Sequence, residues 1–442
     1  MGNLCKLPIL CLWGEKMSSI TNLLSNIEIP RMMKVKQQFV TDSVVDIDGT
    51  LSKQLNRSEI VDKLVPGMRI AIAVGSRGIS QLVPIIQSIV SFLKQQGIEP
   101  FVVPAMGSHG GATAQGQAAV LEKYGVTESA IGVPIISSME IESIYYDTEN
   151  NVDLCMDKNA FESDGVIIVN RIKPHTGFRG HFESGLLKML LIGLGKQKGA
   201  QQAHNFTGKR FADYIEHYGE ILLNRSNVLF GVGIVENAYD NISSINVLTK
   251  DEILIKEPDL LHYAKTQLPK IMFDNLDVLI VQEIGKNISG PGMDPNITHS
   301  YNSLSGISCQ DRAKRIVVLD LTKETQGAAL GIGMADITTK RLFKEIDLNA
   351  TYMNCLTASI TESAKIPMMF DNDREAIQAA IMSLPQVEIS NIQVAMIKNT
   401  LQLGEIWISE SMLDEANKRE NVLIEREAED LVFSDLGNLL EK

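Results

Sequence analysis

RIAIAVGSRG, residues 69–78, is the stretch that decides the fold of this chain. Its first six residues form a short apolar run typical of a strand, and the polar, glycine-containing segment after it predicts a loop. Apolar residues then recur at helical spacing from Leu82 to Leu93 and stop before Gly97. A strand, a loop and a crossover helix in this order are the repeating unit of a parallel α/β sheet.

The same pattern recurs further along the chain. Residues 101–103 (FVV) predict a second strand, residues 107–111 (GSHGG) a second loop, and residues 113–124 a second helix. A third strand, residues 165–169 (GVIIV), runs into the polar segment NRIKPH at 170–175. The predicted fold class is therefore α/β, with mainly parallel strands that end in polar loops.

These loops carry residues that are suited to chemistry. Loops that leave the carboxyl ends of strands gather along one edge of an open α/β sheet, which is where ligands bind. We therefore expect Arg77, His109 and His175, one from each loop, to converge although they are far apart in the sequence.

Four of the seven histidines lie in one part of the chain, namely His109, His175, His181 and His204. Histidine exchanges a proton near neutral pH, so two of them on opposite sides of one carbon can act as a paired acid and base. For any single loop histidine, a hydrogen-bonded structural role is the more common outcome. Position directly after a strand favours the chemical role for His109 and His175.

Lys188 lies within LLKMLLI, residues 186–192, where its neighbours at most helical spacings are apolar. Partial desolvation would lower the pKa of its amine and turn it into a nucleophile. A lysine that extends along an amphipathic helix to reach solvent fits the same pattern equally well. Both interpretations stay open on the sequence pattern alone.

The length of 442 residues predicts two large domains, or about three at the usual 100–200 residues each. A second α/β unit is expected from about Asp274, with three further strands at residues 278–281, 316–319 and 394–397. We place the boundary near residue 272, which gives domains 17–272 and 273–442 with an active-site crevice between them. The highly charged segment 415–429 predicts a solvated helix. This last helical segment could pack against the first domain.

Composition excludes several classes of partner. The net charge of −13 would repel nucleic acid and anionic membrane surfaces. No apolar run reaches the 18 residues of a membrane span, and the apolar stretch at residues 7–13 is short for a signal peptide, so translation from Met17 is the preferred interpretation. The chain has five cysteines, an odd number, and they lie far apart without a CxxC motif: Cys5, Cys11, Cys155, Cys309 and Cys355. This pattern is a poor basis for a set of disulfides, so it predicts a reducing, cytoplasmic location.

Familiar catalytic motifs are missing from the sequence. Neither Gly195-Lys196 nor Gly285-Lys286 completes a P-loop, and there is no HExxH or GxSxG. Nucleotide hydrolysis and the common zinc-protease and serine-hydrolase chemistries are therefore not expected.

Taken in order, the GSRG, GSH and KPH segments, Lys188, His204 and the EIGK segment at 283–286 resemble the lactate racemase family, enzymes that use a nickel-pincer nucleotide. The resemblance implies that Lys188 carries this cofactor through a thioamide link and that His204 is the nickel ligand. It also implies cofactor contacts from Gly75 and Ser76, and partner proteins that synthesise the cofactor.

The resemblance further implies the reaction. His109 and His175 would be the acid–base pair, and Arg77 and Lys286 would hold the substrate carboxylate or neighbouring polar groups. One histidine takes the proton of the C2 hydroxyl while the C2 hydrogen leaves as hydride for the cofactor. The flat 2-oxo acid reorients, hydride returns to its other face and the second histidine handles the proton there, so C2 is inverted.

This sequence departs from the family pattern near the substrate. Val74 stands three residues before the loop arginine, where lactate racemases carry an acid, and Gly110 follows the first histidine in place of a common arginine. The interval between His175 and Lys188 is longer by three residues. It contains Arg179 and His181, which could contact a longer acid or face solvent, so we expect a larger 2-hydroxy acid, such as a sugar acid, rather than lactate.

Two other function classes compete with a racemase or epimerase. Two α/β units around a crevice also suit a two-lobed protein that binds a small anion without catalysis. A Schiff-base enzyme that uses Lys188 ranks third, because that chemistry leaves the histidine cluster unexplained.

Overall fold

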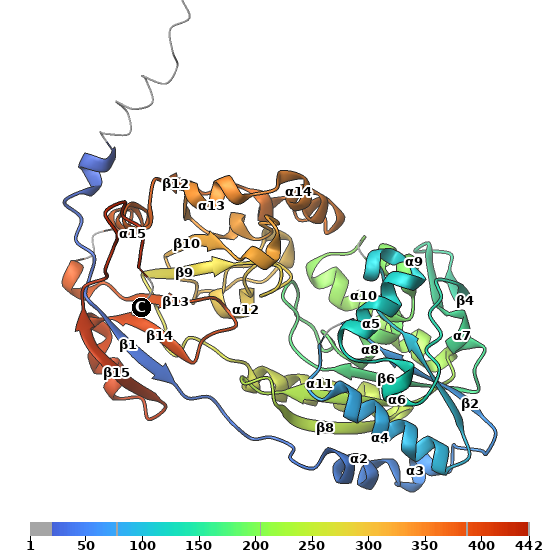
Figure 1. Cartoon of the computed structure of the whole chain (residues 1–442). Helices are drawn as coiled ribbons and strands as arrows, with labels where there is room; N and C mark the ends of the chain where they lie inside the picture. Colours follow the sequence, from blue (N-terminus) through green and yellow to red (C-terminus); the bar gives the residue numbers. More distant parts are fainter. Residues whose placement is uncertain (1–19, 77, 204, 386–387, 441–442) are drawn as a thin grey trace, which may run out of the picture. The chain divides into compact units, whose positions relative to one another are not determined.

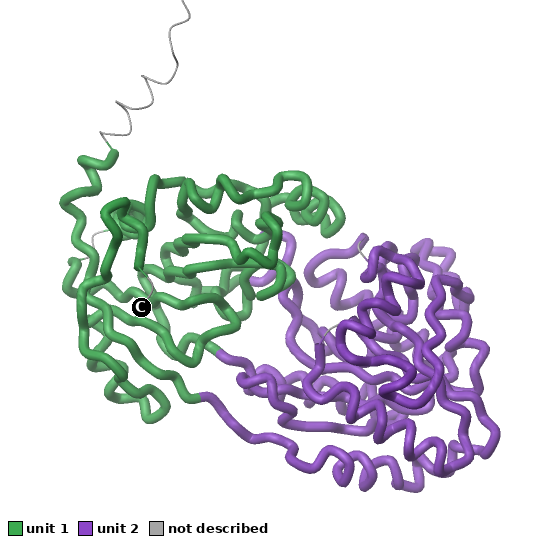
Figure 2. Tube along the Cα trace, viewed as in Figure 1, with its two compact units in different colours: residues 1–38, 270–302, 308–442 green, residues 39–269, 303–307 purple. Residues whose placement is uncertain are grey.

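The computed structural model consists of two compact units (Figure 2). It describes the chain over residues 20–76, 78–203, 205–385 and 388–440. Within these limits, unit 1 contains residues 20–38, 270–302 and the chain from 308 onward, and unit 2 contains residues 39–269 and 303–307. The main change of unit, between residues 269 and 270, lies close to the predicted boundary at 272.

A five-stranded sheet forms the centre of unit 2, with strand order β3-β2-β6-β7-β8. Figure 1 labels β2, β6 and β8 of this sheet. The first four strands in this order are parallel and β8 is antiparallel to β7. Their bounds are β2 (Arg69–Val74), β3 (Glu99–Pro104), β6 (Gly165–Arg171), β7 (Val228–Glu236) and β8 (Ile242–Thr249). A separate antiparallel pair is formed by β4 (Ile141–Asp147) and β5 (Val152–Asp157). The predicted α/β fold, with its first three strands, is confirmed.

Both faces of this sheet are buried. Ile70, Ile72 and Val74 belong to the apolar core on one face, and Ala71 and Ala73 belong to the core on the other face. A strand covered on both sides needs apolar residues at every position, which explains the uninterrupted apolar run that opens the fold.

Helices cover the two faces of the sheet in unit 2. The core with Ile72 includes residues of α2 (Ile47–Leu55), α3 (Ser58–Val61), α4 (Leu82–Gln95), α5 (Ala114–Lys123) and α6 (Glu128–Ile131). The core with Ala71 includes residues of α7 (Lys158–Phe161), α8 (Leu186–Lys188), α9 (Lys196–Ala203), α10 (Gly208–Arg225) and α11 (Lys250–Gln267). The predicted helices after β2 and β3 are α4 and α5.

Unit 1 contains an eight-stranded sheet of order β12-β11-β10-β9-β13-β14-β1-β15. The strands are β1 (Met32–Gln37), β9 (Val278–Ile284), β10 (Arg315–Leu321), β11 (Ile337–Thr339), β12 (Met368–Phe370), β13 (Val394–Ile397), β14 (Glu405–Ser409) and β15 (Val422–Glu429). The helices are α12 (Pro295–Thr298), α13 (Lys340–Glu345), α14 (Leu348–Thr357), α15 (Asp373–Met382) and α16 (Leu413–Asn417). The strands from β12 to β13 are parallel, whereas β14, β1 and β15 join antiparallel.

Strand β1 belongs to unit 1 although it precedes all of unit 2 in the sequence. It pairs with β14 on one side and β15 on the other, and Met32 and Val35 on it are fully buried. The sequence-based division assigned this segment to the first domain. Long-range strand pairing, which a local pattern does not encode, places it with the C-terminal part of the chain.

The helix predicted at 415–429 is wrong. Helix α16 ends at Asn417, and the charged segment forms β15, an edge strand that pairs with β1 inside unit 1. Most of its side chains are exposed, so its charges are hydrated as expected. The backbone hydrogen bonds offered by the open edge of β1 decide the conformation, and charge pattern alone does not distinguish a solvated helix from a solvated edge strand.

Among the helices of the described residues, none combines the length and the apolar character that crossing a bilayer requires.

We expect Ile72→Ala to lower the free energy of unfolding by about 2–5 kcal/mol, because Ile72 is fully buried on the interior strand β2 and the truncation leaves a cavity. Ile255→Ala on the exposed side of α11 is the matched control and should change stability by no more than about 0.5 kcal/mol. Urea unfolding followed by circular dichroism measures both. Equal losses in the two variants would contradict the position of β2 at the centre of the core.

Candidate active site

The loops after β2 and β3 meet at one edge of the sheet in unit 2. The hydroxyl of Ser76, two residues after β2, forms a hydrogen bond with Nδ1 of His109, five residues after β3. The imidazole of His109 is exposed. The expected convergence of these two loops is therefore observed for Ser76 and His109. Arg77, the third position of the same loop, lies outside the described residues.

A buried lysine supports the loop that carries His109. Lys196 is 1% exposed, and its Nζ lies 2.9 Å from Oδ2 of Asp157. The same ammonium group donates to the carbonyl of Pro104 at the end of β3 (2.6 Å) and to Oε1 of Gln117 (3.2 Å). Burial lowers the pKa of Lys196, and the charge of Asp157 opposes this shift.

Gln117 passes this support on to the backbone of the loop. Its Nε2 donates to the carbonyl of Gly107 (2.8 Å) and, more weakly, to that of His109 (3.3 Å). The amide of Gly107 in turn donates to the carbonyl of Gly193 (3.1 Å). The backbone that presents the His109 ring is thus fixed by hydrogen bonds to buried groups on three separate segments.

His175 lies in a loop that is closed at its base. Lys173 and Ser184 exchange two backbone hydrogen bonds, of 2.9 and 3.2 Å. Inside the loop, the buried carboxylate of Glu183 accepts a hydrogen bond from the amide of His175 (2.6 Å) and pairs with Nζ of Lys265 (2.8 Å). A charge-assisted bond to a buried carboxylate is strong, so Glu183 fixes the position of the His175 backbone.

The two extra basic residues of this loop differ in surroundings. Nη1 of Arg179 donates to the carbonyls of His175 (2.5 Å) and Phe178 (3.0 Å), so it braces the loop. The side chain of His181 is 77% exposed, with Nδ1 3.1 Å from Oε1 of Glu216. Substrate contacts from Arg179 and His181 stay predictions. The exposed side chain of His181 fits the other possibility raised for it, that it faces solvent.

Lys188 and His175 share a pair of aromatic rings. Nζ of Lys188 lies 5.6 Å from the centroid of the Phe178 ring and 5.7 Å from that of Phe211, within cation–π range. The imidazole of His175 lies 4.3 Å from the Phe178 ring, centroid to centroid, and the two phenylalanine rings are 4.8 Å apart. The lysine side chain is half-buried. One amine and one imidazole therefore converge on a single apolar surface.

The helix changes its winding directly after Lys188. Residues Met189–Gly193 form one turn of π-helix, in which the amide of Leu194 donates to the carbonyl of Met189 (2.9 Å). Such turns occur often at functional sites. A Cβ on Gly75 would lie 2.7 Å from Cε of Met189, so the loop after β2 passes close to the π-helical turn.

A buried carboxyl group lies behind this segment. Glu257 of α11 is 1% exposed, and its Oε2 accepts a hydrogen bond from the amide of Leu187 (3.1 Å). Desolvation raises the pKa of Glu257 to about 8, because the two amides of Leu187 and Leu186 only partly offset the loss of water. The carboxyl group is therefore mostly neutral at pH 7. A Cβ on Gly185 would lie 1.9 Å from Oε1 of Glu257, so the chain before α8 needs glycine there.

Two further predicted site residues stay predictions. Lys286 lies in unit 1 after β9, and its Nζ donates to Oδ1 of Asn354. His204, the predicted nickel ligand, lies outside the described residues. The predicted crevice between the domains stays a prediction.

The sequence analysis missed the residues that support the site. Arg179 and Glu183 are opposite charges four residues apart, a spacing that signals a local contact, and Phe178 is an apolar residue inside an otherwise polar loop. Lys196 was considered only as part of a P-loop. Glu257 gave no signal, because an acidic residue on a long helix is normally exposed.

Residues 20–212 match the family model described as the lactate racemase N-terminal domain. This part of the chain is therefore similar to the N-terminal domain of lactate racemases. The matched region contains the loops after β2, β3 and β6 as well as Lys188, so the lactate racemase resemblance found in the sequence is confirmed for the segments that form the site.

Two solved structures also match the chain. One is a lactate racemase apoprotein from Thermoanaerobacterium thermosaccharolyticum, with 13% identity and a TM-score of 0.49 over 83% of this chain and 94% of that chain. The other is a protein from Thermotoga maritima, with 13% identity and a TM-score of 0.48 over 81% of this chain and 96% of that chain. No curated protein sequence matches this chain.

We expect Lys196→Met to lower the free energy of unfolding by about 3–5 kcal/mol, because it leaves the buried charge of Asp157 without its partner. The double variant Lys196→Met/Asp157→Asn should be more stable than the single variant, since it removes this charge and an asparagine oxygen can still accept from the amide of Ala160. Urea unfolding compares the two. A double variant less stable than the single one would contradict this account of the pair.

Glu257 predicts a pH dependence of stability. Its raised folded-state pKa contributes stability that is fully present below about pH 4.5 and is lost as the pH rises to about 8, because the unfolded carboxyl ionises first. In Glu257→Gln this loss should be missing, so the stability of the variant relative to the original protein should rise between pH 5 and pH 8. Thermal unfolding across this range measures the difference. Glu220→Gln, at an exposed position of α10, is the control, and identical pH profiles for the protein and Glu257→Gln would refute the assignment.

Proposed function

We propose that this protein is a racemase or epimerase that inverts C2 of a 2-hydroxy acid by reversible hydride transfer to a nickel-pincer nucleotide tethered to Lys188. The observation that carries the proposal is the shared aromatic surface of Lys188 and His175, beside the loop that holds His109. The match of residues 20–212 to the model of the lactate racemase N-terminal domain supports a role of the racemase type.

The surroundings of Lys188 fit a tethered cofactor. Its amine is half-buried and lies against the faces of Phe178 and Phe211, so it can be reached for a covalent bond and is then partly shielded from water. In this proposal Lys188 carries the nucleotide, His204 binds nickel, and Gly75 and Ser76 contact the nucleotide. When bound, the group accepts a hydride from the substrate carbon and returns it. Cofactor-synthesis proteins are then partners.

The two histidines differ in how their protons are held. The Ser76 hydroxyl can donate to Nδ1 of His109 or accept from it, so this ring can take up a proton at Nε2 and release it again. The amide of Gly177 only donates, and it donates to Nδ1 of His175 (3.0 Å). The neutral His175 ring therefore carries its proton on Nε2.

This difference supports the following roles in the resting protein. His109 is the base that takes the proton of the C2 hydroxyl, and His175 directs an Nε2–H at a substrate oxygen. For the reverse stereochemical course, the roles exchange and Nδ1 of His175 must be released from the Gly177 amide. Ser76 and Gly177 are thus positioning groups for the two acid–base residues.

A larger 2-hydroxy acid, such as a sugar acid, is the proposed substrate class. In this proposal Arg77 and Lys286 bind the carboxylate, and the loop with Arg179 and His181 meets the far end of the acid.

Co-expression with cofactor-making enzymes should give a mass adduct on Lys188, and the metallated protein should invert a chiral 2-hydroxy acid in heavy water without losing the original C2 hydrogen. Lys188→Ala should lose the adduct and the activity. His109→Ala and His175→Ala should keep the adduct and lose at least about 100-fold in rate, the usual contribution of a general acid or base. His262→Ala, on the exposed surface of α11, is the control that keeps both.

Intact-protein mass spectrometry and chiral chromatography separate the outcomes. Nickel binding without an adduct would contradict the tether, and wash-in of deuterium at C2 would indicate proton abstraction in place of hydride return. Anion binding that is unaffected by both histidine substitutions, with no inversion, would identify a binding protein without catalysis.

A further inference from the structure

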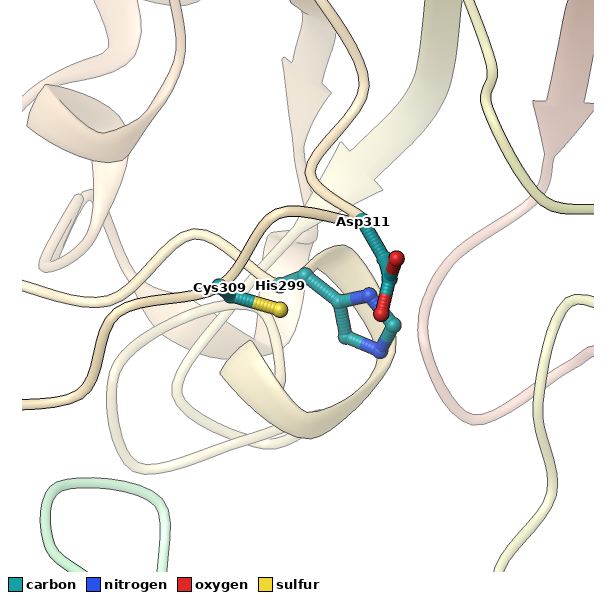
Figure 3. A group of neighbouring side chains, drawn as sticks. All are labelled: His299, Cys309 and Asp311. Carbon is teal, nitrogen blue, oxygen red and sulfur yellow. The ribbon is translucent and has the colours of Figure 1, made fainter.

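His299, Cys309 and Asp311 form a group of potential metal ligands in unit 1 (Figure 3), and none of the three has a role in the proposed catalysis. An imidazole nitrogen, the thiol sulfur and a carboxylate oxygen all lie within 4.8 Å of one another. The sulfur of Cys309 and the carboxylate of Asp311 both point toward the His299 ring (Figure 3). We propose that this cluster, between α12 and β10, binds a zinc ion.

The donor set selects the metal. Mg²⁺ and Ca²⁺ take oxygen ligands, whereas one nitrogen, one sulfur and one oxygen suit a borderline metal such as Zn²⁺. Within the described part of the chain, no hydrogen bond or ion pair occupies the three side-chain donor groups, although they lie this close. The three side chains approach one another without forming hydrogen bonds or ion pairs among themselves, so an ion can bind between them.

The distances also fit zinc after a small adjustment. Ligands at about 2.0–2.3 Å from a tetrahedral zinc ion are separated from each other by roughly 3.3–3.8 Å. The separations in the cluster reach at most 4.8 Å, so closure by about 1 Å completes the geometry. Cys309 and Asp311 lie in the irregular segment before β10, where such a shift does not disturb a sheet.

A partly buried set of hydrogen bonds holds both sides of the cluster. Arg312, next to Asp311, donates through Nε to Oγ of Ser300 (3.2 Å), the residue after His299, and through Nη2 to Oδ2 of Asp336 (2.8 Å). These bonds connect the backbone of the histidine to that of the aspartate. Groups of this kind, behind the ligands, orient a metal site and tune its affinity.

The backbone of His299 supports the same interpretation. It ends α12 with a φ of 54°, in the left-handed region, and its amide donates to the carbonyl of Pro295 (2.9 Å). Histidine is among the residue types that adopt this region more readily than most, and a left-handed residue is a common way for a helix to end. The turn directs the imidazole toward the segment that returns with Cys309 and Asp311.

Three protein ligands leave a fourth position for water or a small anion. On binding, the Cys309 thiol gives its proton to solvent and the thiolate bonds to the metal, while Asp311 binds as the carboxylate and His299 as the neutral ring. The ion closes the base of the segment between His299 and Asp311, whose middle residues 303–307 belong to unit 2. Its role is therefore a staple for this segment.

The test uses the full chain, stripped with a chelator and dialysed against zinc chloride. We expect one zinc per chain, and a Co²⁺-substituted protein with tetrahedral absorption bands and a thiolate charge-transfer band. Cys309→Ser and His299→Asn should weaken zinc binding by at least about 100-fold, since loss of a group behind the ligands alone costs 10–100-fold. Asparagine is chosen because it tolerates a positive φ.

Two controls separate this site from the catalytic one. Lys188→Ala should lose the cofactor adduct and keep the zinc, and His262→Asn should keep both. In the unsubstituted protein, zinc should protect Cys309 from alkylation, as measured by peptide mapping, and magnesium should not, so the proposal is testable even where a variant fails to fold. Unchanged zinc content in both ligand variants, or alkylation of Cys309 at the same rate with and without zinc, would overturn it.

Discussion

Parallel pairing of β2 with both β3 and β6 is the constraint on which the site depends. Val74, the last residue of β2, is in register with Pro104 of β3 on one side and Val169 of β6 on the other. The segments that follow these three strands therefore leave the sheet at nearly the same level. Each then continues into a polar loop, and only there can a side chain reach a ligand without crossing the apolar core. The contact between Ser76 and His109 follows directly from this register.

Ion pairs that each contain a buried carboxylate hold these loops in place. Lys196 with Asp157 supports the loop after β3, and Glu183 with Lys265 supports the loop after β6. Desolvation makes each pair a poor source of net stability, but breaking one leaves a buried charge, so the loop has few alternative positions. Glu257 avoids the cost of burying a charge in another way. Its carboxyl group is mostly neutral, so it can be buried behind α8 without a cationic partner.

Unit 1 contributes a different kind of chemistry. Its cluster of His299, Cys309 and Asp311 lies on irregular backbone between α12 and β10, where side chains from two segments can approach each other freely. The site in unit 2, by contrast, is built on strand ends and a helix, whose geometry is fixed by the sheet. A metal can order the first kind of site, whereas the second is ordered by packing before any ligand binds.

The sequence by itself determined the α/β class, the strands and helices between residues 69 and 124, and the likeness to lactate racemases, because these depend on local periodicity and on ordered short motifs. Tertiary structure alone decided that β1 and β15 pair with each other, that Phe178 and Phe211 bring Lys188 and His175 together, and that Glu257 is buried. These features depend on contacts between residues far apart in the chain, and no local pattern records which distant partner a strand edge or a side chain will meet.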